Sequence, residues 1–534
     1  MLRRAWKPIA ATAVIGTPAY LYYKSQNSAP QTFDAWIRVR GPSGKSEMAT
    51  RSFTLLPMKE LEARIRENEI SETQVRPNGF TWKWTTASLA SNDPIEDASA
   101  SQVVERDDSD PSAPGDYLFF AVMDGHGGFE TSRLLSRVLI KSVALELAEL
   151  IKDSKSSPQT SLLDRVRSLL WLSPSSLSIT APLDANTTRV SQAIEQAFIK
   201  LDNELLQTPL RILANNIDQE GWKTKQLPDL SQHPLALTAM LPAISGSCAL
   251  MAMFDTTHRD LYVACTGDSR AVAGVWEPTR DGKGQWRIEV LSEDQTGRNP
   301  SELARVRSEH PKDEEDYVIR EGRILGGLEP SRAFGDARYK WPRPVQETLN
   351  QVFMVGNDQP MRNPPSLFKT PPYVTARPVV VHRKMSLSSQ SGSEITEKSA
   401  RFLVLATDGL WDQLSNDEVV SLVAGHLSGL KGVVPKSELS NIVPTVSGSA
   451  GVEGKNKKNG AKEGSWAFTD DNLSAHLIRN AFGGGDEDAF RRLLSIPSPH
   501  SRRYRDDVTV TVVCWEEGNE SQAKVVTEKI KSKL

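Results

Sequence analysis

Short apolar runs of strand length alternate with longer stretches of helical periodicity from about residue 80 onward. The clearest unit covers residues 116–151. There the run YLFFAVM predicts a buried strand, DGHGG predicts a turn, and residues 129–151 have the apolar spacing of a helix. The predicted strand therefore places Asp124 at its tip.

Further apolar runs predict more strands at residues 248–254, 261–265, 271–275, 402–406 and 508–514. We expect the first three of these to form a meander. The connection at residues 255–260 is too short for the crossover that a parallel pair needs, so neighbouring strands should be antiparallel. A mainly antiparallel sheet excludes a doubly wound nucleotide-binding fold.

Two kinds of segment surround this pattern. Residues 55–65 (LLPMKELEARI) have apolar positions at helical spacing, and Pro57 is placed to open a short helix before the main domain. Residues 153–178, 383–399 and 436–464 are polar or rich in Ser, Gly and Lys, which predicts long mobile loop insertions.

The overall composition excludes several classes of protein. With 38% hydrophobic and 25% charged residues, the chain is not a polytopic membrane protein. Lys and Arg number 64 against 67 Asp and Glu, a net charge of −3, so no nucleic-acid partner is expected. The cysteines are Cys248, Cys265 and Cys514, without CxxC spacing, which excludes a disulfide framework and a zinc ribbon.

The N-terminal residues 1–33 contain basic residues and no acid, as in a targeting segment. Residues 8–23 are almost entirely apolar but fall short of the roughly 20 residues that cross a bilayer. A secretory signal would also fit this pattern, but the scarcity of cysteine favours mitochondria. A marginal membrane anchor formed by residues 8–23 stays open.

The C-terminus reads Ser532, Lys533, Leu534, which is the tripeptide that a peroxisomal import receptor recognises. An accidental charged tail is the alternative. Because the N-terminal segment is expected to target the chain to mitochondria, we expect dual targeting to mitochondria and peroxisomes.

Acidic residues recur at the ends of the strand-like runs, next to glycine or another acid. They are Glu96, Asp97, Asp124, Asp268, Asp408, Asp506 and Asp507. A single aspartate at such a place is usually a turn residue or a helix cap. If the strands pack together, however, these carboxylates converge and repel one another unless cations compensate them.

The residue types indicate which cation. Oxygen ligands without a Cys or His cluster favour two Mg²⁺ or Mn²⁺ ions rather than zinc. Asp124 is the best candidate to bridge the two ions, and Gly125 allows its own carbonyl to approach as a further ligand. Such a pair of ions activates water for phosphate-ester hydrolysis. His126 could then protonate the leaving oxygen, although a lone histidine is often structural.

Several motifs together resemble the metal-dependent serine/threonine protein phosphatases of the PP2C type. The stretches are PIED (94–97), FFAVMDGHGG (119–128), SGSCA (245–249), VACTGDSRAV (263–272), SRAFGD (331–336), LATDGLWD (405–412) and RDDVTV (505–510), in the order of the family. The resemblance implies an α+β fold, an α/β/β/α sandwich of two antiparallel sheets flanked by helices, with the dinuclear site at one end. It also implies a phosphatase domain over residues 80–518, between an extension at 34–79 and a tail at 519–534.

The resemblance implies a role for each acidic residue. The core metal ligands of the family correspond to Asp124, the Gly125 carbonyl, Asp408 and Asp506. The acids that bind the metals through water correspond to Glu96 and Asp97, and the ligands of a weaker third ion correspond to Asp268 and Asp412. The general acid corresponds to His126. Asp507 stands where many members have Asn.

One position departs from the family. Asn92 stands where many members carry a phosphate-binding Arg, and it is a tentative substrate-binding residue here. This Asn, the long insertions and the stretch ARYKWP (337–342) resemble the pyruvate dehydrogenase phosphatase branch. That branch implies phosphoserine on the E1 alpha subunit of the pyruvate dehydrogenase complex as the substrate. Other mitochondrial or peroxisomal phosphoproteins stay open as alternatives.

Other functions have weaker support. Residues 267–271 (GDSRA) approximate a nucleophile elbow, but AVAGVW after the serine predicts a strand where that motif needs a helix. The interval from Cys265 to Arg270 is one residue too short for a cysteine phosphatase, and GPSGKS at 41–46 lacks the first glycine of a P-loop. A catalytically dead scaffold would not need so many mutually repelling acids.

Overall fold

The computed structural model describes residues 31–41, 45–75, 80–104, 116–151, 186–217, 226–279, 284–385, 399–448 and 463–517. Its centre is a pair of facing β-sheets. The five-stranded sheet has the order β16 (Val379–Lys384), β10 (Asp260–Thr266), β9 (Ala249–Asp255), β6 (Tyr117–Met123) and β5 (Ala98–Val104). Every neighbouring pair in this sheet is antiparallel.

The second sheet has seven strands. Their order is β19 (Thr445–Ser447), β12 (Gln285–Val290), β11 (Arg270–Glu277), β17 (Ser399–Ala406), β21 (Val508–Glu517), β4 (Phe80–Leu89) and β3 (Ile70–Val75). All neighbours are antiparallel except β12 and β19.

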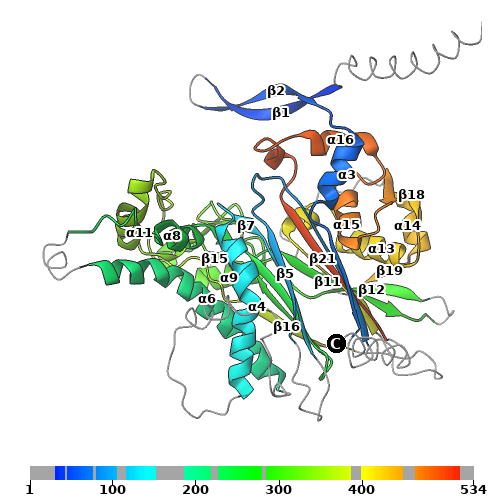
Figure 1. Cartoon of the computed structure of the whole chain (residues 1–534), viewed down its shortest axis with the longest axis horizontal. Coiled ribbons are helices and arrows are strands. Elements are labelled where there is room, and N and C mark those ends of the chain that lie inside the picture. The colour runs from blue at the N-terminus through cyan, green and yellow to red at the C-terminus, as the bar shows by residue number, and fades with distance from the viewer. Residues whose placement is uncertain are drawn as a thin grey trace, which may run out of the picture.

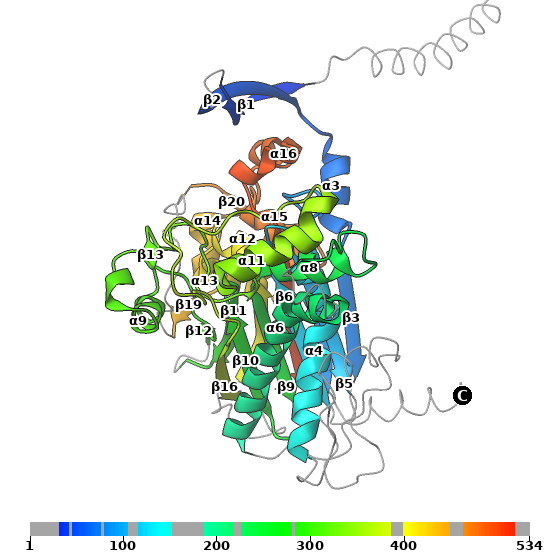
Figure 2. The ribbon, with the colours of Figure 1, turned by 90° about the vertical axis from the view of Figure 1, so that its left-hand side faces the viewer.

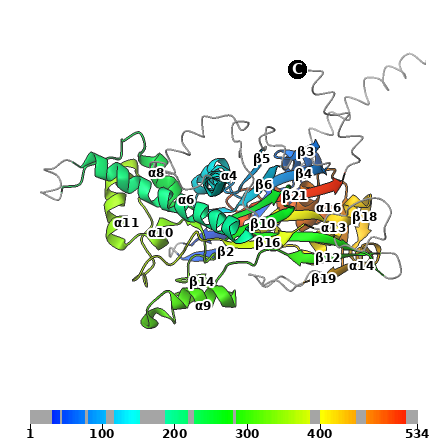
Figure 3. The same ribbon diagram turned by 90° about the horizontal axis from the view of Figure 1, so that it is seen from below.

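Helices cover the outer face of each sheet (Figures 1 and 3). The long helices α4 (Glu130–Ile151) and α6 (Thr187–Asn216) pack on the five-stranded sheet. The seven-stranded sheet is covered by α3 (Met58–Arg66), α13 (Asn416–Leu427) and α15 (Leu473–Ala481). The strand runs are apolar on both faces because one face meets helices and the other meets the second sheet.

Aromatic side chains fill the space between the sheets. Trp82 packs edge to face on Phe254 at 5.0 Å between ring centres, and Trp84 packs on Phe120 at 5.4 Å. Trp515 also contacts Phe254, at 5.4 Å. With a separate helix-facing core on each outer side, the layers are helix, sheet, sheet and helix. This arrangement confirms the predicted α+β sandwich of two antiparallel sheets.

The predicted three-strand meander is only partly right. Strands β9 and β10 are antiparallel neighbours, as expected, but β11 pairs with β12 and β17 in the other sheet. The chain changes sheets between β10 and β11, where Gly267 has a φ of +110°. A Cβ there would lie 2.2 Å from Sγ of Cys248, so only glycine makes this turn. The crossing places Asp268 at the edge where the two sheets meet.

The segment before residue 80 contributes more to the fold than an extension would. The predicted helix is confirmed as α3, and β3 forms an edge strand of the seven-stranded sheet. A hairpin of β1 (Thr32–Arg40) and β2 (Ser46–Thr54) lies at the outer end of the molecule (Figure 2). Its inner residues Ala35, Ile37 and Phe53 pack on Ile496.

Smaller elements lie at the ends of the sheets. Next to the five-stranded sheet are β7 (Gly125–His126), α8 (Ala236–Ile244), β8 (Gly246–Ser247) and β15 (Phe334–Gly335). The excursion between β12 and β16 adds α9 (Pro300–Ser308), β13 (Ile319–Arg320), β14 (Arg323–Ile324), α10 (Ala337–Lys340) and α11 (Arg343–Leu349). The C-terminal third adds α12 (Asp408–Trp411), β18 (Gly432–Pro435), β20 (Ser465–Phe468), α16 (Glu487–Ser495) and η6 (Ser501–Arg503).

The predicted loop insertions have different outcomes. Residues 153–178 lie outside the described ranges, as does most of 383–399. The loop prediction is wrong for the start of residues 436–464, which forms α14 (Lys436–Ile442) and then β19. The physical reason is burial, because Leu439 and Val443 join the core under the seven-stranded sheet.

The predicted targeting signals lie outside the described part of the chain. They are the apolar segment at residues 8–23 and the last three residues. Within the described ranges, no helix combines the length and the apolar character that a membrane span requires.

A buried histidine makes the stability of this fold depend on pH. Burial, assisted by His426, lowers the pKa of His476 to about 3, and the ring is fully covered beside Phe468. The unfolded chain binds a proton below the ordinary pKa of 6.5, whereas the folded chain does not. The contribution of His476 is therefore complete above pH 6.5 and is lost as the pH falls toward 3.

We expect the free energy of unfolding to fall by up to about 1.4 kcal/mol per pH unit below 6.5 through this residue. Urea titrations between pH 7.5 and 4.5 should show a shallower decline for His476→Gln, whose amide does not titrate. Parallel declines in the two proteins would contradict this origin of the pH dependence.

Candidate active site

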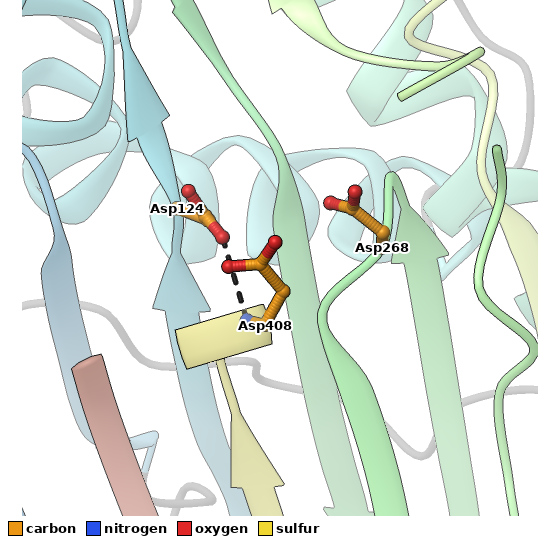
Figure 4. Close-up of side chains that lie close together, drawn as sticks. All are labelled: Asp124, Asp268 and Asp408. Atoms are coloured by element: carbon orange, nitrogen blue, oxygen red, sulfur yellow. Dashed lines mark hydrogen bonds between the residues drawn. The ribbon is translucent and has the colours of Figure 1, made fainter. Parts of the chain in front are cut away.

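Three of the predicted acidic residues converge at one end of the two sheets. Oxygen atoms of Asp124, Asp268 and Asp408 all lie within 4.8 Å of one another (Figure 4). The backbone N–H of Asp408 approaches Oδ2 of Asp124 at 3.5 Å. Residues separated by almost 300 positions in the sequence thus share one acidic site.

Each of these side chains is held at a strand end. Asp124 follows β6, and its carbonyl accepts a hydrogen bond from the N–H of Cys248 at 2.8 Å. Asp408 follows β17 as the first residue of α12. Asp268 lies where the chain changes sheets, and its Oδ1 accepts a hydrogen bond from Sγ of Cys248 at 3.2 Å. The sandwich therefore brings the three carboxylates together through its strand ends.

Gly125 allows the backbone to pack closely beside Asp124. A Cβ at this position would lie 2.1 Å from the carbonyl oxygen of Glu96. No larger residue fits without moving that segment, so glycine is required for the backbone of residue 125 to pack against Glu96.

A second acidic group lies beside the first. Oδ1 of Asp507 accepts the N–H of Asn92 at 2.8 Å, and Oδ2 accepts the N–H of Glu96 at 2.9 Å. The carboxylate of Glu96 in turn accepts the N–H of Gly128 at 2.7 Å. Asp507 thus organises the loop that presents Glu96.

Asn92, the tentative substrate-binding residue, is part of this network. Its Nδ2 donates to Oε2 of Glu96 at 3.0 Å and to Oδ2 of Asp507 at 2.9 Å. Both amide hydrogens therefore bind carboxylates. In this structure Asn92 positions acidic groups and has no donor left for a phosphate.

Burial makes the negative charge of this region costly. The pKa of Asp97 lies well above its ordinary value because the side chain is buried, with Asp507 raising it further. Oγ1 of Thr407 donates a hydrogen bond to Asp97 at 2.8 Å and opposes this shift. Burial likewise raises the pKa of Glu96. Cations bound among these carboxylates would relieve this cost.

The donor atoms fit a hard divalent cation. The three converging side chains offer carboxylate oxygens, and Glu96 and Asp97 add further carboxylates nearby. Cys248 contacts Asp268, but burial first and then Asp268 and Asp124 raise the pKa of its thiol well above the ordinary value. A protonated thiol is a poor metal ligand. The remaining oxygen donors suit Mg²⁺ or Mn²⁺.

Two carboxylates that were expected to bind metal directly, those of Asp506 and Asp412, do not belong to the converging trio. The carboxylate of Asp506 forms an ion pair with Arg502, and its Oδ1 accepts the N–H of Asp507 at 2.7 Å. Asp412 closes α12, where its N–H donates to the carbonyl of Asp408 at 2.8 Å. By contrast Asp268, expected at a weaker third ion, lies directly with Asp124 and Asp408.

His126 has a partner that sequence reasoning missed. Its Nε2 lies 2.7 Å from Oδ2 of Asp336, within hydrogen-bonding distance. Burial lowers the pKa of His126, but the carboxylate of Asp336 outweighs it, with Asp268 and Glu96 adding to the net increase. Asp336 follows Gly335 at the end of β15, the same strand-end pattern of glycine and acid that marked the other candidates.

The rival nucleophiles are not supported by their surroundings. Burial raises the pKa of Cys265, so its thiol is not an activated nucleophile. Oγ of Ser269 is buried without a hydrogen-bond partner, and strand β11 follows it where a nucleophile elbow needs a helix. The converging carboxylates are the only one of these arrangements with groups placed for catalysis.

Comparison with known proteins agrees with this site. The sequence profile described as Protein phosphatase 2C matches residues 182–441. The mitochondrial pyruvate dehydrogenase (acetyl-transferring) phosphatase 1 of Saccharomyces cerevisiae is 36% identical over 86% of this chain and 73% of its own length. A protein phosphatase 2C homolog of Schizosaccharomyces pombe is 34% identical over 85% of this chain and 84% of its own length.

A human relative gives a similar result. The mitochondrial pyruvate dehydrogenase (acetyl-transferring) phosphatase 2 of Homo sapiens is 30% identical over 85% of this chain and 81% of its own length. With its antiparallel sandwich and its oxygen-rich site for Mg²⁺ or Mn²⁺, this chain belongs to the protein phosphatase 2C family and is a metal-dependent protein phosphatase.

Proposed function

We propose that this enzyme removes phosphate from phosphoserine on the E1 alpha subunit of the pyruvate dehydrogenase complex. The observation that carries the chemistry is the convergence of Asp124, Asp268 and Asp408 within 4.8 Å. The substrate is supported by relatives named as pyruvate dehydrogenase phosphatases in yeast and human. Those relatives match most of this chain.

The metal-holding residues of this proposal follow from the site and its resemblance to the family. Asp124, the Gly125 carbonyl, Asp408 and Asp506 would hold two Mg²⁺ or Mn²⁺ ions; Glu96 and Asp97 would bind them through water; and Asp268 and Asp412 would hold a weaker third ion. When bound, these ions supply an activated water and neutralise phosphate oxygens.

His126 acts on the leaving group in this proposal. Its Nε2 is engaged with Asp336, so Nδ1 is the ring atom available to donate a proton to the serine oxygen. Asp336 is a positioning residue because it fixes the orientation of the ring. Gly246 permits the close packing of this pair, since a Cβ there would lie 2.1 Å from Nε2 of His126.

The location of the enzyme forms a further part of the proposal. Residues 1–33 direct the chain to mitochondria, which agrees with the relatives named as mitochondrial. Residues 8–23 are the candidate membrane anchor, and the final Ser-Lys-Leu binds the peroxisomal import receptor. Imaging of separately tagged ends, before and after deletion of Leu534, tests both addresses. Unchanged distribution after that deletion would contradict the peroxisomal signal.

Removal of divalent cations should stop catalysis. Treatment with EDTA is expected to reduce phosphate release from a phosphoserine peptide to background, because the carboxylates alone cannot activate water. Added Mg²⁺ or Mn²⁺ should restore the rate of phosphate release. Ca²⁺ should restore it less well, because Ca²⁺ prefers more ligands at longer distances. Full activity after chelation would reject the metal-dependent mechanism.

The substrate is tested with the phosphorylated pyruvate dehydrogenase complex itself. We expect faster phosphate release from the E1 alpha subunit than from an unrelated phosphoserine protein at equal concentration. Phosphoproteomics of mitochondria and peroxisomes lacking the enzyme should show increased E1 alpha phosphorylation. Increased phosphorylation of peroxisomal proteins alone would instead assign the same chemistry to a different substrate.

A further inference from the structure

The resemblance to the family implies an arginine that binds the phosphate group of the substrate, and this chain lacks an arginine at the corresponding position. Asn92 stands at that position, and both hydrogens of its amide bind Glu96 and Asp507. An amide also lacks the charge that makes guanidinium groups effective phosphate ligands. Another cation, Arg502, lies close to the acidic residues.

Arg502 lies on the short helix η6 (Ser501–Arg503), which is fastened to the segment that carries Asn92. Oγ of Ser501 donates to the carbonyl of Ser91 at 2.6 Å. Oγ of Ser91 donates to the carbonyl of Arg505 at 2.7 Å. These buried hydrogen bonds hold η6 directly beside residues 91 and 92. The turn therefore supplies Arg502 from the side of the site where the family places its arginine.

The guanidinium of Arg502 is close to the acidic residues of the site. It forms an ion pair with Asp506, and its charge lowers the pKa of Glu96 against the larger effect of burial. The side chain is still 41% exposed. A guanidinium that is near these carboxylates and also open to solvent can meet an incoming phosphate.

Neighbouring arginines are engaged in holding the fold. Arg505 is buried and donates to backbone carbonyls, including that of Leu493 at 2.9 Å. Arg270 donates to both carboxylate oxygens of Asp294, at 2.9 and 2.7 Å. Both guanidinium groups are buried in these contacts, so neither has the exposure of Arg502.

We propose that Arg502 is the side chain that binds the phosphate of the phosphoserine substrate, in the role that an arginine at position 92 has in other family members. The planar guanidinium can donate two parallel hydrogen bonds to phosphate oxygens. This inference deepens the proposed function, since it names a substrate-binding residue of the same site.

Binding of inorganic phosphate tests the proposal without catalysis. Isothermal titration calorimetry at saturating Mg²⁺ should give a phosphate Kd at least about tenfold weaker for Arg502→Gln than for the unchanged enzyme, because a charge-assisted hydrogen-bond pair is lost. Arg502→Lys should lie between the two. The matched control is Arg503→Gln, an exposed arginine on the same turn, which should stay within about twofold. Equal phosphate binding by Arg502→Gln and the unchanged enzyme would overturn the proposal.

Binding of Mg²⁺ separates a phosphate-binding role of Arg502 from a merely structural one. Loss of a cation beside Asp506 leaves the site more negative, so Arg502→Gln should bind Mg²⁺ at least as well as the unchanged enzyme does. We therefore expect weakened phosphate binding together with retained Mg²⁺ binding and an unchanged Tm. If phosphate binding fell only because Mg²⁺ binding or folding was lost, and Arg502→Lys behaved normally, the proposal would be wrong.

The same variants separate this inference from the proposed substrate. With p-nitrophenyl phosphate, Arg502→Gln should raise KM by at least about tenfold. Should the unchanged enzyme hydrolyse this compound but not phosphorylated E1 alpha, the proposed substrate fails while the role of Arg502 stands. If the Arg502→Gln variant hydrolyses phosphorylated E1 alpha at the normal rate, the proposed role of Arg502 is wrong and the proposed substrate is supported.

Discussion

Replacement of Asp124 by Asn is expected to lower kcat by about 10³-fold or more. Asp124 joins the strand end of β6 to the shared acidic site, within 4.8 Å of oxygens from Asp268 and Asp408. Loss of its charge would weaken the hold of the site on the Mg²⁺ or Mn²⁺ ions that activate water, and the transition-state stabilisation at stake is several kcal/mol, with about 1.4 kcal/mol for each tenfold in rate. The measurement is phosphate release from a phosphoserine peptide at saturating Mg²⁺.

The matched control for this variant is Asp358→Asn. Asp358 is exposed and has a φ of +54°, a conformation that Asn adopts readily. The Asp358→Asn substitution makes the same chemical change away from the acidic site, and we expect it to leave kcat unaltered. Full activity of Asp124→Asn would contradict the assignment of Asp124 as a metal-holding residue.

His126→Ala is expected to lower kcat for a phosphoserine peptide by about 10² to 10⁴, the usual effect of losing a general acid. The serine oxygen is a poor leaving group and needs a proton, whereas p-nitrophenolate leaves without one. The loss should therefore be much smaller with p-nitrophenyl phosphate. Parallel steady-state assays with the two substrates measure this difference.

Asp336→Asn separates positioning from proton donation. Asn can still accept a hydrogen bond from Nε2 of His126 but carries no charge. We expect a smaller loss of kcat than for His126→Ala, again greater with the phosphoserine peptide than with p-nitrophenyl phosphate. If His126→Ala slowed both substrates equally, the histidine would have a structural role and the general-acid assignment would fail.

Much of the fold is predictable because its strands are short, apolar and well separated. The run at residues 117–123 is buried on both faces, so its composition alone marks a central strand. Helix α3 begins after Pro57 as its sequence predicts. These signals are local, and the packing of the sandwich agrees with them.

Features that depend on distant contacts could not be predicted. Strand β11 follows β10 after a short connection, yet the turn at Gly267 carries it to the other sheet. Helix α14 lies in a sequence rich in Ser, Gly and Lys, and two apolar residues, Leu439 and Val443, are enough to dock it on the core. Local composition does not reveal which of these alternatives tertiary packing will favour.

In the candidate site too, some residues could be predicted from local sequence and others only from contacts between distant segments. The strand-end pattern of glycine and acid identified Asp124, Asp268 and Asp408, which the fold brings together. The same pattern recurs at Gly335 and Asp336, but only the folded chain shows that Asp336 contacts His126. Likewise, the role of Arg502 depends on hydrogen bonds between segments more than 400 residues apart.

A crystal structure with Mn²⁺, phased or mapped by anomalous scattering from the metal, tests the central claim most directly. Our account predicts strong anomalous peaks at the end of the two sheets where the acidic residues converge, in contact with carboxylate oxygens of Asp124 and Asp408, and their loss in Asp124→Asn. An active enzyme whose Mn²⁺ peaks lay elsewhere, with these carboxylates not bound to metal, would contradict it.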